Sequence, residues 1–76
     1  MKTLSQLAVG ETGRIERVDG VPHLRQRLFD MGLTKGRTVQ VEKTSALGSP
    51  LLVSLLGYSL ILGKREADAI FVKELW

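Results

Sequence analysis

Few residues in this chain have side chains that could bind a metal or carry out acid–base chemistry. His23 is the single histidine, and there is no cysteine. On a predicted helix, His23 and Asp30 share a side but lie two turns apart, so Glu42 or another ligand would have to come from a different element. No serine or pair of carboxylates is placed beside His23 for proton transfer. We therefore expect no catalytic residues and no tight metal site.

The glycines of the chain follow two short spacings, Gly10-x-x-Gly13 and Gly32-x-x-x-Gly36. Neither spacing forms the GxGxxG fingerprint of dinucleotide-binding proteins or the GxxxxGK[ST] loop that binds phosphate. Gly13, Gly32 and Gly36 are therefore predicted to be structural, at turns and at a helix end. The absence of cysteine and the single histidine exclude zinc fingers, cysteine-dependent enzymes and multi-histidine metal centres.

Composition and charge indicate one small globular domain, residues 1–76. Of the 76 residues, 43% are hydrophobic and 25% charged, a mixture typical of folded proteins. The segment from Arg14 to Arg37 holds six basic and three acidic residues and so accounts for the whole net charge of +3. A basic surface of this kind suits an acidic protein, a phosphate-bearing partner or a membrane surface.

One uncharged stretch has the length of a membrane span. It runs from Thr44 to Gly63, but serines, glycines and Pro50 interrupt it, so turns between strands are the better interpretation. The first residues contain no apolar run of signal-peptide length. These features predict a cytoplasmic protein.

The first half of the chain predicts a helical turn, a strand and the main helix. Residues 3–7 form the turn, and residues 14–18 form the strand, which ends at Asp19-Gly20. The helix begins at Pro22, a residue favoured at the first helical position. It has an apolar stripe and is closed by Gly32, for which we predict a positive φ. The stripe consists of Val21, Leu24, Leu28 and Met31.

After Lys35-Gly36 the apolar pattern changes to the alternation of strands. Residues 38–42 form one strand, and residues 51–55 and 58–62 form two more that meet near Gly57. A short helical turn at 64–69 precedes a last strand that begins at Ile70. The predicted fold is therefore mostly β: a small antiparallel barrel of about five strands with one main helix and short helical turns. In the strands at 51–55 and 58–62, the side chains predicted to point inward are Leu51, Val53, Leu55, Tyr58, Leu60 and Leu62.

Three apolar residues of these same strands have the opposite parity: Leu52, Leu56 and Ile61. A barrel interior accepts only one set, so these residues should lie under the helical segments or form an exposed patch for a partner. The first alternative is the more common arrangement.

The order of several motifs resembles FeoA, the small ferrous iron transport protein A. Residues 7–15 (LAVGETGRI) and 27–36 (RLFDMGLTKG) carry the resemblance, and residues 60–62, 66–67 and 70–72 continue it. Residues 46–50 (ALGSP) are similar to the family's PLG-x-P loop, although Ala46 stands where proline is usual. The resemblance therefore spans nearly the whole chain.

This resemblance implies an SH3-like barrel in the cytoplasm that assists FeoB, a membrane ferrous-iron transporter with a cytosolic GTP-binding domain. It also implies kinship with the C-terminal domain of iron-dependent repressors, and hence a metal-responsive regulatory module with weak transition-metal binding as an alternative. A second alternative is a basic nucleic-acid-binding barrel, because residues 10–20 loosely resemble the KOW motif. No aromatic ladder accompanies the basic residues, which weakens the nucleic-acid interpretation.

A partner-binding surface is predicted on the 22–31 helix and the 46–50 loop. Phe29 lies off the apolar stripe beside Arg25, and aromatic residues and arginine dominate binding hot spots. Leu47 occupies a turn tip, where it either caps the core or enters a partner pocket. The predicted binding residues are Arg25, Phe29, Leu47, Gly48 and Pro50, and the predicted structural residues are Gly13, Met31, Gly32, Leu33 and Gly36.

Overall fold

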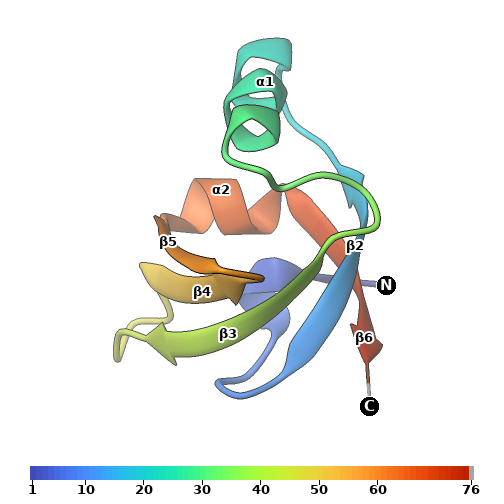
Figure 1. Ribbon diagram of the computed structural model, residues 1–76. Helices are drawn as coiled ribbons and strands as arrows, with labels where there is room; N and C mark the ends of the chain where they lie inside the picture. Colours follow the sequence, from blue (N-terminus) through green and yellow to red (C-terminus); the bar gives the residue numbers. More distant parts are fainter. Residues whose placement is uncertain (76) are drawn as a thin grey trace.

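The computed structural model describes residues 1–75, which form a single antiparallel sheet curved around an aliphatic core, with the main helix standing above it (Figure 1). The elements in chain order are β1 (Lys2–Thr3), η1 (Leu4–Gln6), β2 (Thr12–Val18), α1 (Pro22–Asp30), β3 (Thr38–Thr44), β4 (Leu51–Leu55), β5 (Tyr58–Leu62), α2 (Lys64–Asp68) and β6 (Ile70–Leu75). The strand order is β1-β6-β2-β3-β4-β5. The sixth strand, the short β1, is the one that the sequence did not predict.

Strands β3, β4 and β5 form the meander that the alternating apolar residues predicted. Cross-strand partners of an antiparallel pair share a face, and here Val41 pairs with Val53 and Leu51 with Leu62. All four of these side chains are buried. The 20-residue uncharged stretch therefore forms mainly a β-hairpin, and within residues 1–75 no helix is long and apolar enough to cross a membrane.

The opposite face of this hairpin is not covered by the helices. Leu56 is 93% exposed and Ile61 is 70% exposed, whereas Leu52 is half-buried. The prediction that the helical segments cover these residues is therefore wrong. The reason is that β5 is the last strand of the sheet, and α1 and α2 pack beyond its end rather than over its outer face (Figure 1).

Tyr58 also departs from the expected pattern. It pairs with Leu55 and so has the inward parity, but its side chain is 40% exposed. Its place at the start of β5 puts it at the rim of the barrel. There the hydroxyl donates a hydrogen bond to the Met31 carbonyl, 3.0 Å away, at the end of α1.

Helix α1 begins at Pro22 and ends as the sequence predicted. The Leu33 N–H donates to the Leu28 carbonyl (3.0 Å) and the Gly32 N–H to the Phe29 carbonyl (2.9 Å), the two bonds of a Schellman cap. Gly32 has φ +89°, which confirms the predicted positive φ. Leu24 and Leu28 form the buried face of the helix, but Val21 at the end of the predicted stripe is exposed.

Candidate functional site

A groove of about 700 Å³ lies between α1 and the second half of β2. Arg25 and Phe29 form its helical wall, and Glu16, Arg17 and Val18 form the strand wall. Phe29 is 62% exposed, so a large aromatic ring borders the groove without being part of the core. The loop after α1 closes the groove with Leu33, Thr34 and Lys35.

The charges around this groove are unequally compensated. Arg17 Nε lies 2.9 Å from Asp19 Oδ1, and its guanidinium stacks 4.4 Å from the Phe71 ring centroid. Glu16 pairs with Arg14 at 3.5 Å. The ion pairs found among residues 1–75 involve neither of the groove's remaining cations, Arg25 and Lys35. The groove therefore offers two uncompensated positive charges beside an apolar surface.

Two polar contacts add to the core packing of Leu24 and Leu28 in holding α1 above the barrel. Arg27 Nη2 lies 2.9 Å from Glu66 Oε2 on α2, and Glu66 Oε1 accepts the Gly63 N–H at the start of α2 (2.8 Å). The Arg27 contact is an ion pair without the alignment of a hydrogen bond, since Glu66 Oε2 has no hydrogen-bond partner. The second contact is the bond from Tyr58 to Met31. Both tie the helix to elements that follow it in the chain.

The 46–50 loop lies apart from this groove. It belongs to the β3–β4 connection, which Figure 1 places at the end of the barrel opposite α1. Leu47 is 94% exposed, so the structure has it at a turn tip and not folded over the core. Pro50 borders a separate hollow of about 170 Å³, together with Leu52 and Ile61. The continuous surface that we predicted from the helix and the loop is therefore two separate surfaces.

The residues predicted to be structural have identifiable places. A β-carbon on Gly13 would lie 2.9 Å from Val72 Cβ, so β2 and β6 approach too closely for a larger residue. Leu33 is buried and Met31 packs against the core. Gly36 has φ +92°, and a β-carbon added there would meet nothing within 4 Å.

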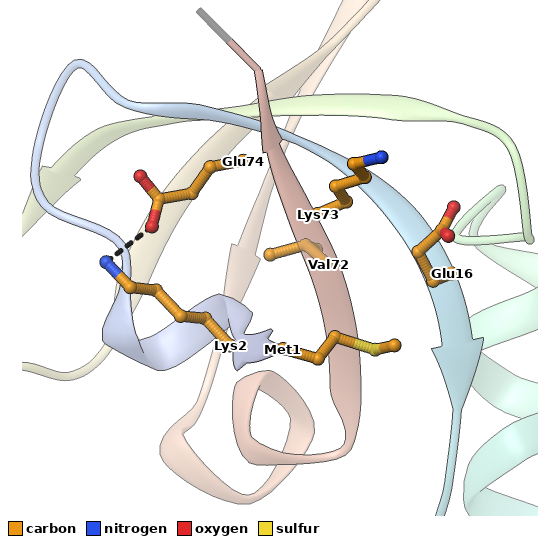
Figure 2. A pocket seen from close by; sticks show the side chains of 6 residues that line it. All are labelled: Met1, Lys2, Glu16, Val72, Lys73 and Glu74. Carbon is orange, nitrogen blue, oxygen red and sulfur yellow. Dashed lines mark ion pairs between the residues drawn. The ribbon is translucent and has the colours of Figure 1, made fainter.

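A smaller hollow of about 290 Å³ lies where β1 meets β6 (Figure 2). Its ion pair joins Lys2 Nζ to Glu74 Oε1 at 2.5 Å, and this bond holds the pKa of Glu74 below its ordinary value. Figure 2 shows Val72 on β6 with the ion pair on its left and Lys73 on its right, and Glu16 on the neighbouring β2. Lys73 also lines the hollow and takes part in none of the ion pairs found among residues 1–75, so this hollow has one unpaired cation where the groove has two.

No group of three or more His, Cys, Asp or Glu side chains within residues 1–75 is arranged to hold a metal ion. His23 is exposed in the first turn of α1, and Asp30 is at the other end of that helix. Asp30 accepts a hydrogen bond from Gln26 Nε2 at 2.9 Å. Glu42 accepts one from Ser59 on β5.

The sequence did not predict the strand wall of the groove. Glu16, Arg17 and Val18 look like ordinary strand residues, and their exposure depends on the course of the loop that follows α1. Lys35 belongs to the basic segment, which was the one signal available. Tyr58 was predicted to be a core residue, and nothing local indicated that its hydroxyl would reach α1.

Comparison with known proteins identifies close relatives. Residues 2–74 match the family model of the FeoA domain. The chain is 31% identical, over 70 residues, to the Fe(2+) transport protein A/Fe(2+) transporter FeoB fusion protein of Porphyromonas gingivalis. That match covers 92% of this chain and 8% of the fusion protein. The crystal structure of an iron uptake regulatory protein (FeoA) superposes with a TM-score of 0.89 at 32% identity, covering 97% of both chains.

Two further structures bear on the fold and on metal binding. The FeoA of Stenotrophomonas maltophilia, described as an SH3 domain protein, was crystallised with zinc; it is 27% identical, with a TM-score of 0.82 over 96% of this chain and 91% of that one. A manganese-dependent transcriptional repressor shares the fold at 22% identity, with a TM-score of 0.90 over 97% of this chain and 36% of the repressor. The predicted SH3-like barrel is confirmed.

Proposed function

This chain belongs to the FeoA domain family, and we propose that it is a cytoplasmic accessory protein of ferrous iron uptake that binds the cytosolic GTPase region of a FeoB-type transporter. In this role it is a binding module and not an enzyme. Ferrous iron is the cargo of the transporter, and the module requires no metal centre of its own.

The observation that supports this proposal most directly is the fusion relative. In that protein, a segment 31% identical to 92% of this chain is part of the same polypeptide as a FeoB transporter. Covalent linkage keeps two modules at a high effective concentration, which benefits domains that act together. A separate chain of the same family must instead find its transporter by binding, so it needs a recognition surface.

The groove beside α1 provides such a surface. Phe29 offers apolar area that the domain's own core does not use, and Arg25 lies beside it. Uncompensated charge speeds association, whereas burial of an aromatic ring slows dissociation. We assign the main contact to Arg25 and Phe29, and a second, separate contact to Leu47, Gly48 and Pro50 at the other end of the barrel.

The test is a titration of the purified protein with the GTP-binding cytosolic region of the FeoB-type transporter from the same genome. Phe29→Ala should weaken binding by about 1–3 kcal/mol while leaving the melting temperature nearly unchanged, because the ring is 62% exposed. Val9→Ala is the matched control, since Val9 is a similarly exposed apolar residue that does not line the groove.

Ferrous iron uptake in a strain that lacks the gene provides the functional measurement. The wild-type protein and Val9→Ala should restore uptake, and Phe29→Ala should restore it poorly. Absence of binding to the transporter, combined with salt-dependent retention of RNA, would contradict the proposal and favour a nucleic-acid-binding barrel.

A further inference from the structure

The strand wall of the groove is an unpaired edge of the sheet. On one side, β2 pairs with β6 as far as Val18 opposite Ile70. On the other side, its pairing with β3 ends at Arg14 opposite Thr38. Strand β2 therefore continues past Arg14, where its pairing with β3 ends.

The loop before β3 makes the last backbone bonds on this side. The Ile15 N–H donates to the Arg37 carbonyl (2.8 Å), and the Gly36 N–H donates to the Ile15 carbonyl (2.7 Å). Within residues 1–75, no backbone bond reaches residues 16–18 from the β3 side. A β-bulge between Ile15 and Arg17 adds to the local twist of the strand.

The groove occupies the space beside this edge. Its lining takes three consecutive residues of β2, the 33–35 loop and the outer side of α1. In Figure 1, β2 rises past the loop toward α1, and β3 begins lower in the sheet. An unpaired strand edge exposes backbone donors and acceptors that another extended chain can bond.

We propose that this edge, residues 16–18, accepts a short extended segment of the partner protein as an added strand in the groove. An extended chain rises about 3.3 Å per residue, so three or four residues span this edge. A helical partner would leave the edge unpaired, because a helix bonds its own backbone groups internally. This inference rests on the proposed function and specifies how the partner occupies the same groove.

The charges beside the edge define the chemistry of that segment. Arg25 and Lys35 line the groove and take part in no ion pair within residues 1–75, whereas Arg17 is engaged by Asp19 and Phe71. Phe29 and Val18 supply the apolar surface. The segment therefore carries acidic side chains toward Arg25 and Lys35 and an apolar side chain toward Phe29.

Amide hydrogen exchange, followed by NMR on the ¹⁵N-labelled protein, tests the added strand residue by residue. The probe is the purified cytosolic region of the FeoB-type transporter. Binding should slow exchange of an amide within residues 16–18 by about tenfold or more, because that N–H becomes hydrogen-bonded. Binding without such protection would overturn strand addition and leave the proposed function intact. No binding at all would overturn the proposed function.

Charge reversal tests the chemistry of the segment. Lys35→Glu should weaken binding about tenfold, a change of about 1.4 kcal/mol. Lys73→Glu is the matched control, since Lys73 is an exposed lysine on β6 that lines neither the groove nor the hollow beside Pro50. Equal affinities for the two variants would overturn the proposal that the bound segment is acidic. Protection of the same amides in concentrated protein without the transporter would assign the edge to a second copy of this chain and overturn the partner named here.

Discussion

A β-carbon on Gly32 would overlap the hydroxyl oxygen of Tyr58. This close approach joins the end of α1 to the start of β5, because the same hydroxyl donates to the Met31 carbonyl at 3.0 Å and accepts from Arg37 Nη2 at 3.4 Å. Gly32 is therefore constrained twice, by its φ of +89° and by the space that Tyr58 fills. The position of α1, and with it one wall of the groove, depends on this contact.

Gly32→Ala should destabilise the protein more than Gly36→Ala does. Both glycines have positive φ, which costs an alanine about 1–2 kcal/mol. Only at position 32 does the new methyl group meet another side chain. In a domain of this size, each 1 kcal/mol lowers the melting temperature by about 4–8 °C. Thermal denaturation measures the difference, and equal losses for the two variants would show that Tyr58 does not restrict position 32.

Tyr58→Phe should partly relieve the effect of Gly32→Ala. Alone, the substitution should cost about 0.5–1.5 kcal/mol, because it removes the hydrogen bond to Met31. In the Tyr58→Phe background, Gly32→Ala should lower the free energy of unfolding by nearly the same small amount as Gly36→Ala does in the wild type. A double-mutant cycle by chemical denaturation gives the coupling energy. Simple additivity would argue against the contact.

Acid should weaken the link between η1 and α2. The Ser5 hydroxyl donates to Asp68 Oδ1 (2.5 Å) and Lys64 Nζ to Oδ2 (2.9 Å), and these bonds hold the pKa of Asp68 below its ordinary value of 3.8. A carboxyl with a lowered folded-state pKa stabilises the fold above the unfolded-state pKa and loses that effect as the pH falls through the folded-state value. Below about pH 4, the melting temperature should therefore fall more steeply for the wild type than for Ser5→Ala. Parallel pH profiles would refute this role.

Leu47→Ala should weaken binding of the transporter's cytosolic region without loss of stability. The side chain is 94% exposed, so its removal leaves no cavity, and a leucine buried in a partner pocket contributes about 1–3 kcal/mol. Val9→Ala is the control, since Val9 is an exposed apolar residue that lines neither the groove nor the hollow beside Pro50. Calorimetric titration compares the two. If they bind equally well, Leu47 is not a contact.

Arg25→Ala should act mainly on the association rate. An exposed charge steers the encounter, and salt screens this effect. The variant should bind more slowly than the wild type at low salt and about equally fast at high salt. Arg65→Ala removes the same charge from α2, outside the groove, and should change the rate less. Stopped-flow kinetics at two salt concentrations measures this, and a dominant change in dissociation would assign Arg25 to the buried contact instead.

The sequence by itself determined the elements other than the short β1, because their signals are local. Alternating valines and leucines specified β3 and β4, Pro22 specified the start of α1, and Gly32 specified its end. The order of motifs identified the family, since those residues are read along the chain without any knowledge of their contacts. Exposure of Phe29 also followed from helical periodicity alone.

Only the tertiary structure decided which elements border one another. It separated Leu47 from α1, because the β3–β4 turn and the helix lie at opposite ends of the barrel. It also placed residues 16–18 at the groove, since the pairing of β2 with β3 ends at Arg14. Tyr58 reaches Met31 across 27 residues of sequence. Contacts of this kind depend on how a whole sheet curves and where a loop leaves it, and no local pattern of side chains encodes either.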